Sequence, residues 1–68
     1  MPTIIVEMFT GRTDEQKRTL VKLVTESAVE ALGVRPEGVR VRINEIEKRH
    51  SAIGGVLRSD AEADPPQS

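Results

Sequence analysis

The sequence predicts a small α/β protein made of one β-strand, one helix and a second, parallel β-strand. Two segments rich in β-branched residues, 3–9 and 39–46, flank one long segment with apolar residues at helical spacing. A strand–helix–strand order predicts a βαβ unit, whose crossover is right-handed in nearly all proteins. The two strands are therefore expected to be parallel. Residues 1–57 are expected to form the domain. Residues 58–68 are polar, acidic and contain two prolines, so they are expected to be disordered.

The first strand has two largely apolar faces. One face is predicted to carry Ile4, Val6 and Met8, and the other carries Ile5 and Phe9 together with polar residues. A strand that is apolar on both sides is normally covered on both sides. We expect the domain's own helix to cover one face and another subunit to cover the other.

The helix has clear start and stop signals. Thr13 followed by Gln16 forms a capping box, which favours a helix beginning at that point. Apolar residues then recur at helical spacing as far as Leu32. Gly33 suits a left-handed C-terminal cap, and Pro36 prevents the helix from continuing.

The second strand alternates in character. Val41 and Ile43 are predicted to face the helix, whereas Arg40 and Arg42 lie on the opposite face. The following segment, 48–57, contains adjacent glycines and short apolar residues. It is expected to form a turn or small hairpin that packs on a neighbouring subunit.

The size of the chain favours an oligomer. A domain of 68 residues buries little apolar surface relative to the cost of ordering its backbone. The chain has no cysteine, so neither disulfides nor thiolate metal sites can stabilise it. We therefore expect a homo-oligomer in which the subunit interfaces complete the core.

Composition argues against several classes of partner. Ten basic and eleven acidic residues are mixed along the chain, so no strong basic field exists to attract nucleic acid. With one aromatic residue the chain also lacks the stacking surfaces of single-strand binders. No apolar run approaches the roughly 20 residues of a membrane span, and no leader is seen, so a cytoplasmic protein without membrane contact is expected.

Pro2 is the first candidate for a catalytic group. If Met1 is removed, Pro2 becomes a free secondary amine at the start of a strand. An α-amino group has an ordinary pKa of about 7.7–8.0, and apolar burial or nearby cations lower that pKa towards the value that suits a general base. Arg12 and Arg40 are candidates to supply such cations. The alternative is a proline that only begins an edge strand.

Several motifs together carry a family resemblance. They are Met1-Pro2, the turn sequence 11–17 (Gly-Arg-Thr-Asp-Glu-Gln-Lys), Val-Arg-Val at 39–41, and His50 followed by Ile-Gly-Gly at 53–55. In this order and spacing the chain resembles the 4-oxalocrotonate tautomerase family over about residues 2–57. The resemblance implies a βαβ fold, a dimer with a four-stranded sheet and a hexamer made of three dimers.

The resemblance also implies roles for individual residues. Pro2 matches the family's general base and acid, and Arg40 matches the arginine that binds the substrate carboxylate and polarises its carbonyl oxygen, expected here from a neighbouring subunit. Arg12 matches the arginine that holds the far carboxylate of a dicarboxylate substrate, next to a helix N-terminus where anions bind well. The alternative for both arginines is an ordinary solvated position.

Ser51 departs from the family pattern. Tautomerases that act on dicarboxylic dienols typically carry phenylalanine at this position, where its ring forms a wall of the pocket. We include Ser51 among the substrate-binding positions and expect a wider or wetter pocket there. Phe9, Ile53 and Val56 are the candidates for an apolar wall in its place.

No metal site is expected. His50 is the only histidine and has no partner at ligand spacing. Glu45 and Glu47 are candidates to activate water, but they lie in a charged run that more often faces solvent.

The sequence therefore predicts a tautomerase of the 4-oxalocrotonate tautomerase type that needs no cofactor. By resemblance it converts 2-hydroxydienoates such as 2-hydroxymuconate into 2-oxo-enoates, small carboxylates met in the breakdown of aromatic compounds. Two alternatives stay open. One is a non-catalytic or hetero-oligomeric subunit with the same fold, and the other is a related haloacrylate hydratase or dehalogenase, which would need an acid where Ser51 stands.

Overall fold

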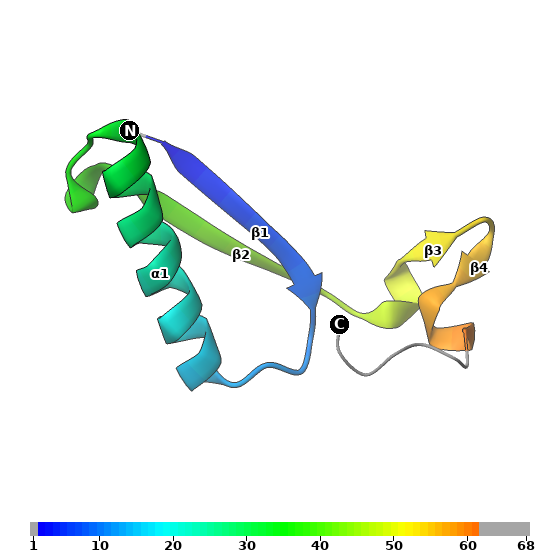
Figure 1. Ribbon diagram of the computed structural model, residues 1–68. Helices are drawn as coiled ribbons and strands as arrows, with labels where there is room; N and C mark the ends of the chain where they lie inside the picture. The colour runs from blue at the N-terminus through cyan, green and yellow to red at the C-terminus, as the bar shows by residue number, and fades with distance from the viewer. Residues whose placement is uncertain (1, 62–68) are drawn as a thin grey trace.

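The central feature is a pair of parallel strands connected by one long helix (Figure 1). The structure is a computed structural model that describes residues 2–61. Its main elements are β1 (Thr3–Phe9), α1 (Asp14–Leu32) and β2 (Arg40–Ile46), followed by the short strands β3 (Ala52–Ile53) and β4 (Val56–Leu57). Three 3₁₀ turns, η1 (Pro36–Gly38), η2 (Lys48–His50) and η3 (Arg58–Asp60), join these elements. The predicted α/β class and βαβ order are confirmed.

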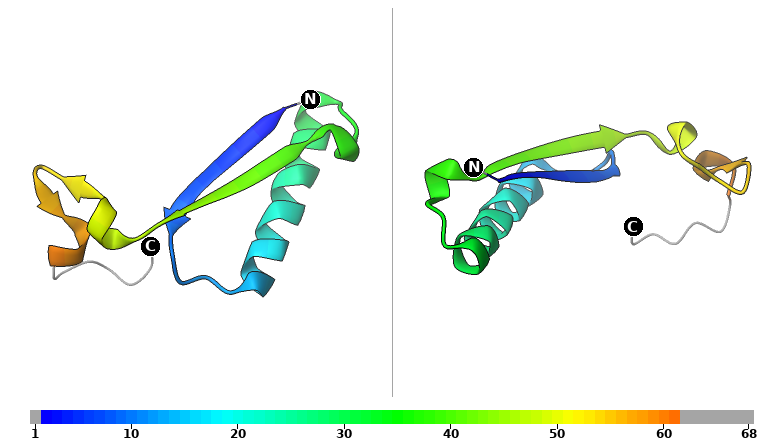
Figure 2. Two further views of the ribbon diagram at one scale, coloured as in Figure 1. Left: turned by 180° about the vertical axis from the view of Figure 1, so that it is seen from behind. Right: turned by 90° about the horizontal axis from the view of Figure 1, so that it is seen from above.

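The register of β1 and β2 fixes which residues face the helix. Ile4 pairs with Val41 and Val6 pairs with Ile43, and these four half-buried residues lie on the side that α1 covers. Figure 2 shows α1 lying on one side of the two strands only. The opposite side of the sheet is left uncovered, and Ile5 there is 63% exposed.

The helix ends where the sequence predicts. Gln16 donates its backbone N–H to the Thr13 hydroxyl (3.1 Å), and the Gln16 side chain accepts from the Thr13 N–H (3.0 Å), which completes the capping box. Gly33 adopts a φ of 68° and donates its N–H to the carbonyl of Val29 (2.9 Å). This left-handed geometry is the reason for glycine at that position.

The C-terminal segment forms the expected hairpin. β3 and β4 pair antiparallel around Gly54 and Gly55, whose φ angles of 60° and 85° suit a tight two-residue turn. The hairpin lies beyond the carboxyl end of β2 and away from α1 (Figure 1). Residues 58–68 were expected to be disordered, but 58–60 form η3 and Ala61 caps it; the remainder, 62–68, lies outside the described residues.

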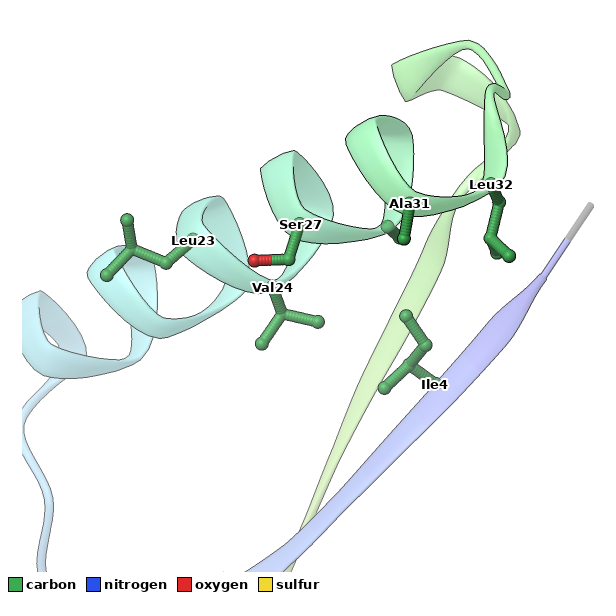
Figure 3. Close-up of a pocket in the computed structure, with 7 residues that line it drawn as sticks. Ile4, Leu23, Val24, Ser27, Ala31 and Leu32 are labelled. Atoms are coloured by element: carbon green, nitrogen blue, oxygen red, sulfur yellow. The ribbon is translucent and has the colours of Figure 1, made fainter.

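One protomer has almost no core of its own. Within residues 2–61 Ala28 is the only buried residue, at 7% exposure, whereas Leu32 and Ile53 are 60% and 68% exposed. An apolar groove of about 470 Å³ runs between α1 and β1, next to the outer edge of β1 (Figure 3). Its lining residues are Ile4, Leu23, Val24, Ser27, Ala28, Ala31 and Leu32. An exposed apolar groove is typical of a surface that contacts another molecule.

Candidate active site

Pro2 and Arg40 are neighbours at the amino end of the two strands. Arg40 donates its backbone N–H to the carbonyl oxygen of Pro2 (2.9 Å), which starts the parallel ladder. Both residues line a cavity of about 250 Å³, whose other walls are Thr3 and the segment 37–39. The two strongest catalytic candidates of the sequence therefore lie at one place.

The turn η1 is the element that brings these two residues together. Pro36 takes the first position of η1, where a proline loses no hydrogen bond. Gly38 then donates its N–H to the carbonyl of Arg35 (2.9 Å), and Val39 donates to the carbonyl of Pro36 (3.1 Å). The chain thereby passes from the end of α1 to the start of β2, beside the start of β1.

Arg40 lies on the uncovered side of the sheet. It pairs with Thr3, and Arg42 pairs with Ile5 two residues further along the same side. Arg40 is exposed, so its guanidinium can reach a ligand without displacing a core contact. A planar guanidinium can bind a carboxylate through two parallel hydrogen bonds and keeps its charge at all working pH values.

Arg12 lies at the opposite end of the molecule. It belongs to the loop between β1 and α1 and lines a cavity of about 220 Å³ with Met8, Gln16 and Leu20. The seven residues of β1 separate it from Pro2. A strand of that length spans roughly 20 Å, which is far longer than a six-carbon substrate. Pro2 and Arg12 of one chain therefore cannot hold the same molecule.

Ser51 also lies at this second end. Its N–H donates to the carbonyl of Lys48 (3.2 Å), and its carbonyl accepts from the N–H of Arg58 (2.7 Å). Ser51 lines a cavity of about 360 Å³ together with the end of β1 and with Ile46. Pro2 and Arg40 thus share one cavity, whereas Arg12 and Ser51 lie near the carboxyl end of β1 in two different cavities.

Glu45 differs from its expected position. Its register partner is Met8, so it lies on the α1 side of β2, and it forms an ion pair of 2.9 Å with Lys17 of the helix. The two side chains are only 30% and 27% exposed. The hydrogen bond to the Glu45 carboxylate raises the pKa of Lys17 above its ordinary value. The ion pair of Glu45 with Lys17 thus links α1 to β2. The charged run 45–49 had instead predicted a carboxylate that faces solvent.

One carboxylate near Pro2 was not predicted. Glu37 of η1 lines the same cavity as Pro2 and Arg40. Its position three residues before Arg40, directly after the helix-stopping proline, is the sequence signal that could have indicated it.

The structure contains neither a metal-ligand cluster nor a membrane-spanning helix in the part of the chain it describes. Within residues 2–61 no three histidine, aspartate or glutamate side chains gather closely enough to hold an ion. His50 is exposed and uses its backbone N–H in a turn to Glu47 (2.8 Å). Over the same residues, no helix has both the length and the apolar character that a bilayer crossing requires.

Known proteins match the chain along nearly its whole length. The profile of the Tautomerase family, described as tautomerase enzyme, matches residues 2–61. The 2-hydroxymuconate tautomerase of Bacillus subtilis (strain 168) is 48% identical over 62 residues, which cover 91% of this chain and 100% of the relative.

Solved structures agree with that match. A 4-oxalocrotonate tautomerase isozyme from Methylibium petroleiphilum superposes with a TM-score of 0.85 at 39% identity, covering 94% of this chain and 100% of the other. A chain of the heterohexamer 4-oxalocrotonate tautomerase from Chloroflexus aurantiacus J-10-fl gives 0.82 at 30% identity, with coverages of 90% and 98%. The resemblance stated from the motifs is confirmed.

Proposed function

This chain belongs to the tautomerase family, and we propose that it is a cofactor-independent isomerase that converts 2-hydroxydienoates such as 2-hydroxymuconate into 2-oxo-enoates. The observation that carries the proposal is the pairing of Pro2 and Arg40, which are joined by a backbone hydrogen bond and line one cavity. An amine and a fixed cation are the two groups that this proton transfer needs.

The reaction moves one proton and no net electrons. With Met1 removed, the neutral Pro2 amine takes the proton of the substrate's 2-hydroxyl group. The electron pair of that O–H bond forms the 2-oxo group, and the conjugated double bonds shift by one position. The Pro2 ammonium then returns the proton to the far carbon of the diene, and the amine is again neutral.

Arg40 has a separate role in this scheme. As the hydroxyl loses its proton, negative charge develops on the oxygen at carbon 2, and a positioned guanidinium stabilises that charge. The planar guanidinium of Arg40 can also bind the adjacent carboxylate through two hydrogen bonds. Its location on the exposed side of β2 leaves the guanidinium accessible to a substrate at the Pro2 cavity or at that of a neighbouring chain.

Arg12 is proposed to bind the distal carboxylate from a different chain. The geometry of one protomer supports this, because Arg12 and Pro2 lie at opposite ends of β1. Each substrate would then contact the amino end of one protomer and the carboxyl end of another. Such a site exists only in an oligomer.

We propose a homo-oligomer, specifically a hexamer of three dimers in the cytoplasm. The apolar groove between α1 and β1 adjoins the unpaired outer edge of β1, so a second copy can extend the sheet to four strands and cover the groove in one step. The name of the Chloroflexus relative raises a second possibility, a hetero-oligomer, in which a partner chain supplies part of the pocket near Ser51.

One experiment on the purified protein tests the function. The intact mass under native and denaturing conditions gives the number and kind of chains and shows whether Met1 is present. Ultraviolet absorbance then follows 2-hydroxymuconate on the same sample. Rapid conversion by a homo-oligomer that lacks Met1 supports the proposal, whereas a sample of that composition with no conversion contradicts it.

A further inference from the structure

Phe9 occupies an unusual place for the only aromatic residue of the F, W and Y types in the chain. It ends β1 on the side of the sheet that α1 does not cover, where its register partner is Ile46. Both residues are half-buried even though this side of the protomer is otherwise open. Contacts from outside the sheet therefore cover part of the ring and leave the rest accessible.

Two cations of the C-terminal segment provide that cover. The ammonium of Lys48 lies 5.9 Å from the centre of the Phe9 ring, and the guanidinium carbon of Arg58 lies 5.6 Å from it. Lys48 begins η2 and Arg58 begins η3, so the cations come from the two sides of the hairpin. Contacts of this kind contribute about 0.5–1 kcal/mol each at exposed sites and more when water is excluded.

Ser51 connects the two cations through its backbone. It donates to Lys48 and accepts from Arg58, so the segments that hold the ring are tied to each other at Ser51. Ser51 and Phe9 also face the same cavity of about 360 Å³, together with Glu7, Met8 and Ile46. A small side chain at position 51 leaves the ring as the aromatic surface of that cavity.

The two other wall candidates do not reach this cavity. Ile53 and Val56 lie in the hairpin strands and are 68% and 52% exposed. Of the three apolar residues that the sequence offered, Phe9 alone lines the cavity with Ser51.

We propose that Phe9 is the aromatic wall of the substrate pocket and a specificity-determining residue for planar, conjugated carboxylates. A flat diene packs well against an aromatic face. Lys48 and Arg58 are positioning residues that hold the ring, and their charges favour an anionic substrate nearby. The proposal rests on the proposed tautomerase function and adds the residue by which the pocket selects its substrate.

Nuclear magnetic resonance of the wild-type protein gives a direct test that does not depend on turnover. The ring protons of Phe9 are the only phenyl signals of the chain, because the sequence has one phenylalanine and neither tyrosine nor tryptophan. The probe is cis,cis-muconate, a six-carbon diene dicarboxylate without a 2-hydroxyl group. Saturable shifts of the Phe9 ring signals are expected, with smaller shifts from adipate, the saturated dicarboxylate of equal length. Unchanged Phe9 signals at saturating muconate overturn the proposal.

Kinetics of two variants provide the second test. Phe9→Leu keeps the apolar bulk but removes the ring, so we expect KM for 2-hydroxymuconate to rise roughly tenfold with a smaller change in kcat. Adding Ser51→Phe to Phe9→Leu returns a ring to the same cavity and should lower KM again. An unchanged KM in Phe9→Leu, or a raised KM that Ser51→Phe does not lower, contradicts the assignment.

The two tests separate this inference from the proposed function. If muconate shifts the Phe9 ring but 2-hydroxymuconate is not converted, the pocket assignment stands and the proposed reaction fails. If conversion is rapid but the ring does not respond, the reaction stands and the role of Phe9 fails.

Discussion

The two ends of the sheet are built in different ways. At the amino end, Pro2 and Arg40 are joined by the first hydrogen bond of the β1–β2 ladder, so the strand pairing itself fixes their backbones. At the carboxyl end, the Phe9 ring lies under two cations from η2 and η3, the turns on either side of the hairpin, and lines one cavity with Ser51. The end fixed by the strand pairing carries the groups proposed for proton transfer. The end next to the C-terminal hairpin carries the groups proposed for substrate selection.

This difference predicts unequal effects of mutation. Changes at the amino end should reduce turnover, because proton transfer needs exact placement of an amine and a cation. Changes at the carboxyl end should mainly alter KM and the preference among substrates. Each chain contains both the amino-end and the carboxyl-end residues, but the seven residues of β1 separate the two sets.

Pro2→Ala should have the largest effect. The variant keeps an amine but loses the pyrrolidine ring that fixes the nitrogen at the start of β1, so kcat should fall by about a hundredfold. Stopped-flow absorbance with 2-hydroxymuconate measures the loss, and native mass spectrometry checks that assembly is unchanged. Wild-type turnover in this variant would show that Pro2 is not the general base and acid of the reaction.

Arg40→Ala should have the next largest effect. Loss of one group that stabilises developing negative charge typically reduces kcat by about 10²-fold. Arg42→Ala is the matched control, because Arg42 lies on the same strand and the same side, two residues further from Pro2. Equal losses in the two variants would indicate a general electrostatic effect of this strand and no specific role for Arg40.

Lys17→Met should affect stability and leave both ends of the sheet intact. Lys17 has a raised pKa in the folded state because of Glu45, so its contribution to stability is full below its unfolded pKa of about 10.4 and is lost as the pH rises through the folded value. Urea unfolding should show a less stable variant at pH 7 and a smaller difference above pH 11. Lys22→Met, in the more exposed pair with Glu26, is the control. A difference that does not shrink at high pH would exclude the ion pair as its cause.

The fold was predictable from the sequence because its signals are local. The capping box at Thr13, the left-handed cap at Gly33 and the alternation in 39–46 each depend on neighbouring residues, and the structure confirms all three. The glycine pair at 54 and 55 likewise identified the hairpin turn.

The arrangement of the site was less predictable because it depends on distant contacts. The alternation that puts Val41 and Ile43 on the α1 side also puts Glu45 there, but the sequence does not indicate that Glu45 pairs with Lys17 of the helix. The position of Phe9 beside Ser51 depends on two cations that are 39 and 49 residues further along the chain than the ring (48 − 9 and 58 − 9). Neither contact follows from local spacing.

A mixed-oligomer experiment tests most directly whether the two ends of different chains form one site. Pro2→Ala and Arg12→Ala proteins are unfolded together, refolded, and shown by native mass spectrometry to contain both chains. If the site joins two chains, some sites combine an intact Pro2 with an intact Arg12. The kcat/KM for 2-hydroxymuconate should then exceed the average of the two separate variants. A value equal to that average would show that each site uses Pro2 and Arg12 of the same chain, and would contradict the shared site.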